Sequence, residues 1–250
     1  MNKVLMILVL SLAPYSVLAQ PSPPNACEPG EIDVRIVNND LNGALNVSRA
    51  CVAHFKATVT KSPKEALTGY EWLDLLSWAY HLCAQAQVQA MMGDRAGADA
   101  SIKAAEDVYR DWRPWFDSPV VDWASVIDAT KGFVLEKSGN IDAAKRWYLE
   151  HRSEYATGRL AVLALSDPNN DDAIRYARGL LAVGAKNPTA HVVMGAVLES
   201  RGQKAEALTE YQTAVHQMTK AELQNEFLPI AVAESARAKS AIARLTAEVK

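Results

Sequence analysis

The 250-residue sequence has little that is typical of a membrane protein or of a β-sheet. Beyond the first twenty residues, no segment approaches the roughly 18 consecutive apolar residues that a spanning helix needs. Alternation of β-branched and polar residues is nearly absent, and the one short stretch of this kind, residues 31–37, has no clear assignment. These absences predict an all-α chain with no integral membrane segment.

An excess of positive charge is also missing. The sequence contains 26 Lys and Arg against 29 Asp and Glu, and the basic residues are scattered along the chain. Binding to a nucleic-acid backbone requires a clustered basic surface. Nucleic acid is therefore excluded as a predicted partner.

Recognisable catalytic and metal-binding patterns are lacking. Among the five His and three Cys, only Cys51 and His54 stand at a helical ligand spacing, which is also common in ordinary packing. No nucleophile or phosphate-loop motif occurs. Residues 167–172 resemble the start of a calcium loop, but Asp172 stands where glycine is needed and Arg178 where a bidentate glutamate is needed. The sequence predicts no enzyme, no catalytic or metal site, and no cofactor.

The N-terminus has the pattern of a secretory signal peptide. Lys3 is followed by an apolar run over residues 4–12 and by a small-residue exit that ends at Ala19. Residues 1–19 are thus predicted to be a leader that is cleaved near Ala19, which would place the protein in the periplasm or outside the cell. Residues 20–39 would form a Pro-rich N-terminal tether.

The three cysteines allow one disulfide in an oxidising compartment. Cys27 with Cys51 is the preferred pair, because it would attach the tether to the first predicted helix. Cys51 with Cys83 is the alternative pairing, and three buried thiols are the third interpretation.

Proline positions divide the remaining chain into helical segments. An N-terminal helix is expected within residues 40–69, with Asp40 as its cap. Residues 220–250 are expected to be C-terminal capping helices, a short one that starts at the capping-box pattern of residues 219–222 and a longer one over 229–249.

A repeated spacing of small and apolar residues lies between these ends. The residues Gly195, Leu198, Gly202, Ala207 and Tyr211 have the same offsets as Gly132, Leu135, Gly139, Ala144 and Tyr148. This spacing resembles the tetratricopeptide repeat (TPR), in which two helices form a hairpin around a turn glycine. The resemblance implies an α-α superhelix, or solenoid, of TPR-like hairpins.

About four such repeats are expected over residues 70–219. A weaker copy contains Gly93 and Ala98, although Gln85 and Gln89 stand where its first helix should be apolar. A compressed repeat would place helices at 155–165 and 171–183. The excess length before Gly139 maps to a Trp- and Pro-rich insertion near residues 111–119.

The resemblance also implies a concave groove that binds a protein or peptide. Its lining positions, taken from the family pattern, are mostly small and apolar, which favours an apolar or amphipathic helix as the partner. We therefore predict an exported adaptor, acting in envelope or secretion assembly. The implied groove residues are Val126, Ala129, Phe133, Glu136, Thr189, Val192, Ala196 and Glu199.

Aromatic residues around the insertion leave an alternative function open. Trp112, Trp115 and Trp123 are either core residues or anchors for a ligand. In the second case the protein would be a helical-repeat enzyme or a small-ligand-binding protein with a pocket beside these tryptophans.

Overall fold

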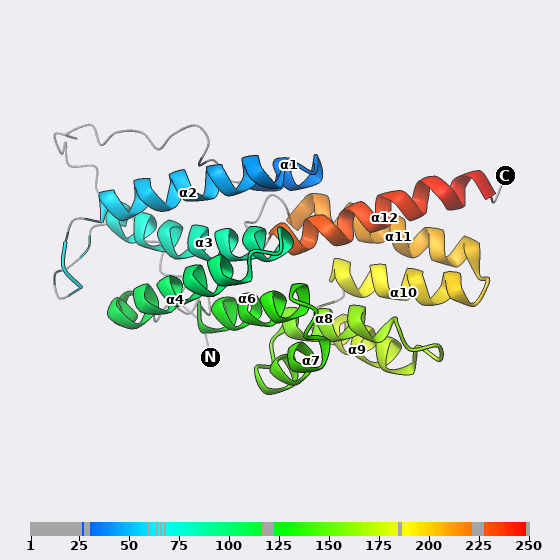
Figure 1. Cartoon of the computed structure of the whole chain (residues 1–250). Coiled ribbons are helices and arrows are strands. Elements are labelled where there is room, and N and C mark those ends of the chain that lie inside the picture. Colours follow the sequence, from blue (N-terminus) through cyan, green and yellow to red (C-terminus); the bar gives the residue numbers. More distant parts are fainter. Residues whose placement is uncertain are drawn as a thin grey trace, which may run out of the picture.

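The computed structural model describes residue 27 and residues 31–59, 61–63, 65, 67, 69–116, 123–184, 187–221 and 228–248, and the predicted leader lies outside this part. The described residues form helices and turns without a strand (Figure 1). The helices are α1 (Glu31–Val37), α2 (Leu41–Thr58), α3 (Gly69–Met91), α4 (Arg95–Asp111), α5 (Arg113–Phe116), α6 (Trp123–Lys137), α7 (Ile141–Glu150), α8 (Glu154–Ala164), α9 (Asp171–Val183), α10 (Pro188–Ser200), α11 (Lys204–Ala221) and α12 (Leu228–Glu248).

Antiparallel hairpins stack in chain order, as in a helical solenoid. The hairpins are α3/α4, α6/α7, α8/α9 and α10/α11, and the first helix of each contacts the first helix of the next. We call the surface formed by α3, α6, α8 and α10 the first-helix face. The all-α prediction is confirmed.

The turns of three hairpins use glycine for a conformational reason. Gly93, Gly139 and Gly202 have φ of 80°, 78° and 77°, a left-handed conformation that side chains with a Cβ rarely adopt. Nearby polar residues then start the next helix: the Asp94 carboxylate accepts a hydrogen bond from the Gly97 backbone N–H at 2.9 Å. The predicted turns at Gly139 and Gly202 are therefore present.

Two further glycines allow close contact between the helices of a hairpin. A Cβ built on Gly132 would lie 2.1 Å from Cε1 of Tyr148, and one on Gly195 would lie 2.9 Å from Cε1 of Tyr211. Both tyrosine rings are buried. The repeated Gly and Tyr positions thus form the same helix-helix contact in both hairpins.

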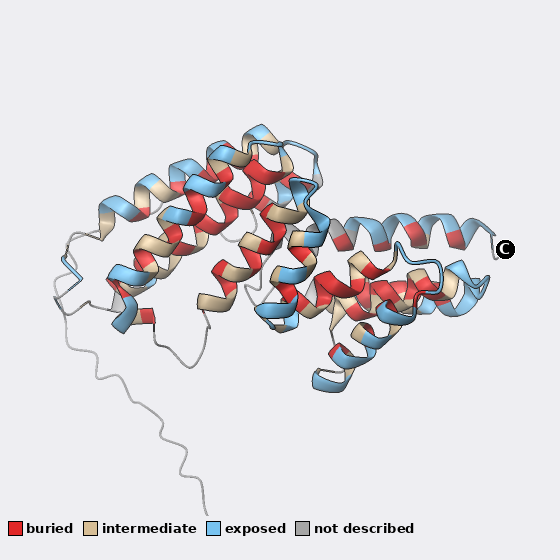
Figure 2. Ribbon diagram, turned by 60° about the horizontal axis from the view of Figure 1, so that its bottom comes forward, coloured by how far each residue is buried: buried red, intermediate tan, exposed pale blue. Residues whose placement is uncertain are grey.

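Burial follows the inward sides of the helices, as Figure 2 shows by the red stripes on facing helices and the pale blue outer surfaces. Gln85 and Gln89 of α3 stand where the weakest predicted repeat required apolar residues, and both face this interior. Ser101 of α4 receives a hydrogen bond from the Gln85 amide at 3.0 Å, and its hydroxyl lies 2.7 Å from the Gln89 side chain. Their mutual hydrogen bonding explains why glutamines replace apolar residues here.

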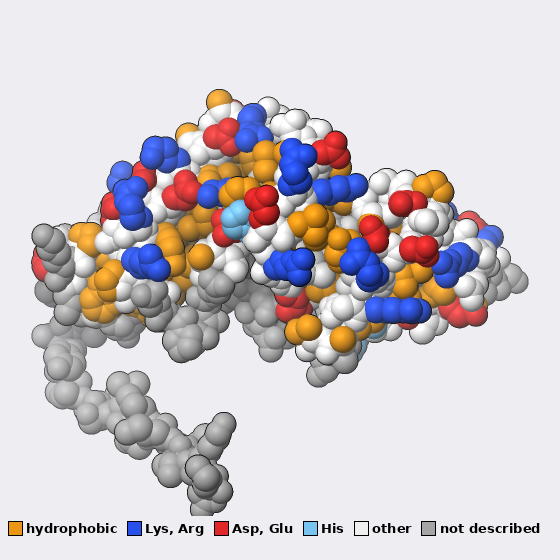
Figure 3. Space-filling model, turned by 90° about the horizontal axis from the view of Figure 1, so that it is seen from below, with side chains coloured by type: hydrophobic (Ala, Val, Ile, Leu, Met, Phe, Trp, Pro, Cys, Tyr) orange, Lys and Arg blue, Asp and Glu red, His pale blue; other side chains and the backbone are white. Residues whose placement is uncertain are grey.

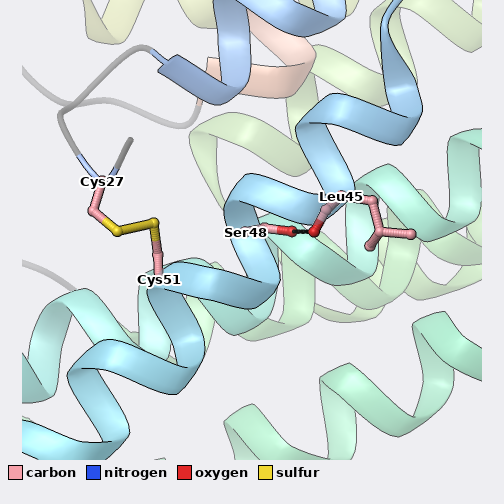
Figure 4. Close-up of a disulfide and its surroundings, with 4 residues drawn as sticks. All are labelled: Cys27, Leu45, Ser48 and Cys51. Atoms are coloured by element: carbon pink, nitrogen blue, oxygen red, sulfur yellow. Dashed lines mark hydrogen bonds between the residues drawn. A yellow bond between two sulfur atoms is a disulfide. The ribbon is translucent and has the colours of Figure 1, made fainter. Parts of the chain in front are cut away.

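The two ends of the array meet. Residues 31–37, which had no clear assignment, form α1 within the predicted tether, and α1 contacts both α2 and α12. Asp40 caps α2 as predicted, with its carboxylate 2.8 Å from the Gly43 backbone nitrogen. Cys27 and Cys51 form the preferred disulfide (Figure 4). Cys83 is a buried free thiol.

Two predicted boundaries differ from the structure. No new helix begins at the pattern over residues 219–222, because α11 continues through Ala221 without interruption; residues 222–227 lie outside the described part. The insertion near 111–119 is not a simple loop, since α4 extends to Asp111 and Arg113–Phe116 form the single turn α5. Met218, the residue before this pattern, is buried in α11.

Candidate functional site

The predicted groove residues do not line an open surface in this structure. Val126, Ala129, Phe133 and Val192 are buried, and the remaining four are at most partly exposed. Thr189 of α10 lies against α8, because a Cβ built on Gly158 would be 3.3 Å from its Cγ2. Packing between successive hairpins therefore covers most of these positions.

The C-terminal helix covers the predicted positions of the last hairpin. Val192 belongs to a buried cluster that includes Ala238, Ala241 and Leu245 of α12, and Ala196 packs against the same cluster. Glu199 forms an ion pair with Arg244 of α12. A helix of the chain itself thus occupies the site that the sequence assigned to a partner.

A buried ionic cluster lies where α6, α8 and α12 meet. Arg159 donates from Nε to Glu136 Oε2 at 3.1 Å and from Nη2 to Glu136 Oε1 at 2.5 Å. Its Nη1 donates to Glu234 Oε1 at 3.0 Å. All three side chains are less than one-tenth exposed. The cluster therefore joins three helices through one guanidinium group.

Glu136 also has a second cation beside it, since Lys137 Nζ lies 4.0 Å from Glu136 Oε1. Two carboxylates share one guanidinium, and Glu234 Oε2 is buried without a hydrogen-bond partner among the described residues. Burial alone would lower the pKa of Arg159, but the nearby Tyr155 hydroxyl and Glu136 carboxylate raise it above its usual value. Arg159 is therefore charged at neutral pH.

The last hairpin repeats this arrangement. The Tyr148 hydroxyl lies 3.5 Å from Glu136 Oε2, and the Tyr211 hydroxyl lies 3.1 Å from Glu199 Oε2. In each case an arginine from a later helix completes the contact. For Glu136 it is Arg159 of α8, the first helix of the next hairpin, and for Glu199 it is Arg244 of α12. We call each set of Glu, Tyr and Arg a clasp. By this geometry α12 sits where the first helix of a further hairpin would lie.

The two clasps differ in exposure. The side chain of Arg159 is 6% exposed, whereas that of Arg244 is 49% exposed. The difference arises because Arg159 is enclosed between Glu136 of α6 and Glu234 of α12, whereas Arg244 lies near the end of α12, the last described helix. The Arg244 guanidinium, with the Tyr211 hydroxyl, lowers the pKa of Glu199, so this carboxylate remains charged at neutral pH.

The tryptophans near the insertion lie in the core. Trp112 and Trp123 are buried in one cluster with Phe116, and Trp115 packs against the same cluster. The Trp72 indole donates to the Trp115 carbonyl oxygen at 3.0 Å. This placement agrees with the core interpretation of these residues, whereas the anchor interpretation would require exposed rings.

The described residues also line an open cleft, of about 590 Å³, between the α3–α4 and α6–α7 turns. Both of its cations have partners: Arg95 binds Asp99 at 2.7 Å and donates to Ser138 at 3.0 Å, and Lys137 Nζ lies 4.0 Å from Glu136 Oε1. This cleft lies at the opposite end of α4 from Trp112, about 25 Å along a 17-residue helix. Figure 3 shows acidic and basic side chains mixed with apolar ones over the face seen from below.

Within the described part of the chain, no three His, Cys, Asp or Glu side chains are placed to hold a metal ion. Each of the helices there is too short or too polar to span a bilayer.

Comparison with known proteins gives no further assignment. The chain matched no protein-family model, no curated protein and no solved structure. The function must therefore be inferred from the residues and their geometry.

Sequence reasoning found part of this site. The common offset from Gly132 and Gly195 identified Glu136 and Glu199, because these positions repeat. Arg159 and Glu234 were missed, since they are 75 residues apart and no local pattern marks either of them. Only the packing of α12 brings them together.

Proposed function

We propose that the protein is an exported TPR-like scaffold that binds a helical segment of another protein during envelope or secretion assembly. Export is supported by the leader pattern of residues 1–19, and a TPR-like array by the repeated glycine and tyrosine contacts. A stack of hairpins has one extended surface formed by equivalent helices, which suits it to bind segments of other chains.

The clasp carries this proposal. Glu136 with Tyr148, and Glu199 with Tyr211, each bind an arginine from the helix that lies next to them. The first-helix face is therefore a surface whose repeated chemistry receives helices. Its contact residues are small and apolar around a charged pair, which fits an amphipathic helix better than an extended acidic tail.

Site-specific photo-cross-linking on the mature chain tests the proposal. A photoreactive residue at Thr189, which is half-buried on α10, is compared with one at Asp172, whose side chain is 60% exposed on α9. We expect a defined exported protein to be captured from Thr189 and not from Asp172, with the cross-link in a helical segment of that protein. Equal capture from both positions, or no protein above background from either, would contradict the adaptor proposal.

The chain with the photoreactive residue at Thr189 and the chain with it at Asp172 must first show the wild-type helix content and the wild-type urea midpoint. A second control removes surface charge on the outer side without touching the clasps: Arg175→Ala breaks only the exposed contacts of Arg175 with Asp172 and Tyr176. Capture from Thr189 should be unchanged in this variant.

A further inference from the structure

The C-terminal helix α12 covers the last hairpin with one side and leaves its other side uncovered. Ala238, Ala241 and Leu245 on its inner side are buried in one cluster with residues of α10 and α11. The residues on the opposite side are exposed from position 236 onward, and Figure 2 shows them in pale blue along the helix that ends at C. α12 is therefore a packed cap, and its outer side is the open end of the stack.

Small side chains run along the middle of this outer side. At about 100° per residue, the positions opposite the inner side are spaced as i, i+4, i+7 and i+11 and cover about 16 Å of the helix axis. They are Ala236, Ser240, Ala243 and Ala247, and all four are exposed. Because the distance between two packed helices depends on the side chains at their contact, small residues here allow another helix to approach closely.

Cations flank these small residues and outnumber the acids. Arg237 and Arg244 are seven positions apart and share one flank, while Lys239 lies on the other. Arg237 and Lys239 form no ion pair with any residue that the structure describes. Glu248, the only acid among residues 236–248, is bound by Lys204 at 2.9 Å and lies 4.0 Å from Arg244 Nη1. The outer side of α12 is thus basic, although the whole chain has more acidic than basic residues.

The first clasp shows what the second one lacks. Arg159 binds carboxylates from two other helices, Glu136 through Nε and Nη2 and Glu234 through Nη1. Arg244 binds the carboxylate of Glu199 through Nη1, and its side chain is still 49% exposed. A guanidinium group has five N–H donors and readily binds a second carboxylate. The second clasp can therefore accept an acidic group from solvent.

We propose that the outer side of α12 binds an acidic α-helix of another protein, and that a carboxylate of this helix completes the second clasp at Arg244. A second carboxylate, two helical turns away on the partner, binds Arg237 on the same flank. The small residues between the two flanks provide the space for the partner helix. This inference goes beyond the proposed function, because the outer side of α12 is not part of the first-helix face.

An anionic membrane fits this surface less well than an acidic helix does. No large apolar side chain is exposed between residues 236 and 248, so this side of α12 has nothing to insert among lipid chains. Recognition of lipid headgroups by charge alone uses clusters of about four to eight cations, whereas three are present here. The arrangement of two arginines beside a row of small residues therefore favours a protein helix.

A labelled helical peptide of about 18 residues is the probe. It consists of alanine and glutamine, with two glutamates separated by two helical turns, and its matched control has glutamine in place of both glutamates. Fluorescence anisotropy measures the binding of each peptide to the full mature chain. At about 0.05 M salt the glutamate peptide should bind at least about fivefold more tightly than the control, as two partly exposed ion pairs provide. Raising the salt to about 0.5 M should reduce this preference.

Three variants with the wild-type helix content and urea midpoint locate the binding. Arg237→Gln and Arg244→Gln should each reduce the preference for the glutamate peptide by at least about twofold. Arg178→Gln makes the same charge change on the exposed side of α9, where Arg178 also forms no ion pair among the described residues, and should leave the preference unchanged. If Arg244→Gln does not fold, Arg237→Gln decides, because it breaks no ion pair.

A charge reversal gives an independent reading. Arg237→Glu should bind a peptide with lysines in place of the two glutamates at least about threefold more tightly than the wild-type chain does. Equal affinity of the wild-type chain for the glutamate and glutamine peptides, or no binding at about 1 mM peptide, would overturn the proposal. So would an equal loss of preference in Arg178→Gln and Arg237→Gln, since the effect would then come from net charge.

Two other occupants of this surface are tested with the same variants. The mature chain should not sediment with vesicles of phosphatidylglycerol and phosphatidylcholine, and it should be monomeric in analytical ultracentrifugation. Vesicle binding that Arg237→Gln abolishes would make a lipid surface the occupant and overturn the proposal. A dimer that the same variant dissociates would make a second copy of the chain the occupant, with the same consequence. None of these measurements depends on capture from Thr189, so the adaptor function and this inference can fail separately.

Discussion

Substitution of the helix-packing glycines provides a graded test of the hairpin geometry. Gly132, Gly158, Gly179 and Gly195 all lie inside helices, so each gains the same intrinsic helix preference when it is replaced by alanine. They differ in the space around the new Cβ. The nearest non-local atom would be at 2.1 Å for Gly132, 2.9 Å for Gly195 and 3.3 Å for Gly158, and nothing lies within 4 Å of Gly179.

The magnitudes follow from two opposing terms. Replacing glycine by alanine inside a helix stabilises the fold by about 0.5 to 1 kcal/mol. Overpacking of a filled interior costs about 1 to 3 kcal/mol. Gly179→Ala should therefore raise the free energy of unfolding by about 0.5 to 1 kcal/mol, because only the first term applies.

Gly132→Ala should be the most destabilising of the four. The new methyl group would overlap the ring of Tyr148, which is 1% exposed and has its hydroxyl next to the Arg159 cluster. The ring has no free space into which it can move, so we expect a net loss of about 1 to 3 kcal/mol. Gly195→Ala should be milder and Gly158→Ala near neutral.

Urea denaturation followed by circular dichroism measures this order. For a chain of this size, a change of 1 kcal/mol corresponds to a shift of about 2 to 4 °C in Tm, so thermal unfolding gives an independent reading. A Gly132→Ala chain as stable as Gly179→Ala would refute the close contact with Tyr148. So would a stability order that does not follow the distances.

Other residues give three further expectations. Burial lowers the pKa of His81 from 6.5 to about 4, so the unfolded chain gains a proton that the folded chain does not as the pH falls from 6.5 towards 4. Stability should decline over that range by up to about 3 kcal/mol, and urea midpoints at pH 7 and pH 4 should show a smaller decline in His81→Phe. Burial also raises the pKa of the Cys83 thiol to about 12, so iodoacetamide at pH 8 should label it, by mass spectrometry, only after denaturation; rapid labelling of the folded chain would contradict its burial. Cys51→Ser, or reduction of the bond to Cys27, should lower the free energy of unfolding by about 3 to 4 kcal/mol for the 24-residue separation; an unchanged urea midpoint would show that the bond does not constrain the unfolded chain.

The sequence by itself determined the helical elements, because short-range chemistry controls where a helix starts and ends. Helix α9 has the predicted bounds of 171–183, and Asp40 caps α2 as its side chain required. Glycine at positions 139 and 202 predicted turns with positive φ. For the cysteines the sequence left three interpretations open, and the structure contains the preferred one, the Cys27–Cys51 disulfide.

Local patterns failed where a competing contact was stronger. The capping-box pattern over residues 219–222 did not begin a new helix at residue 219, because α11 continues to Ala221. Gln85 and Gln89 appeared to break a repeat, yet Ser101 satisfies them across the hairpin. In both cases the deciding interaction joins residues that local spacing does not relate.

Only the tertiary structure decided which surface is free. The groove positions were assigned from the register of two hairpins, but their exposure depends on what the rest of the chain places against them. The return of α12 brings Glu234 to Arg159 and Arg244 to Glu199. Such contacts span up to 75 residues of sequence and depend on the path of the whole array, so no local pattern predicts them.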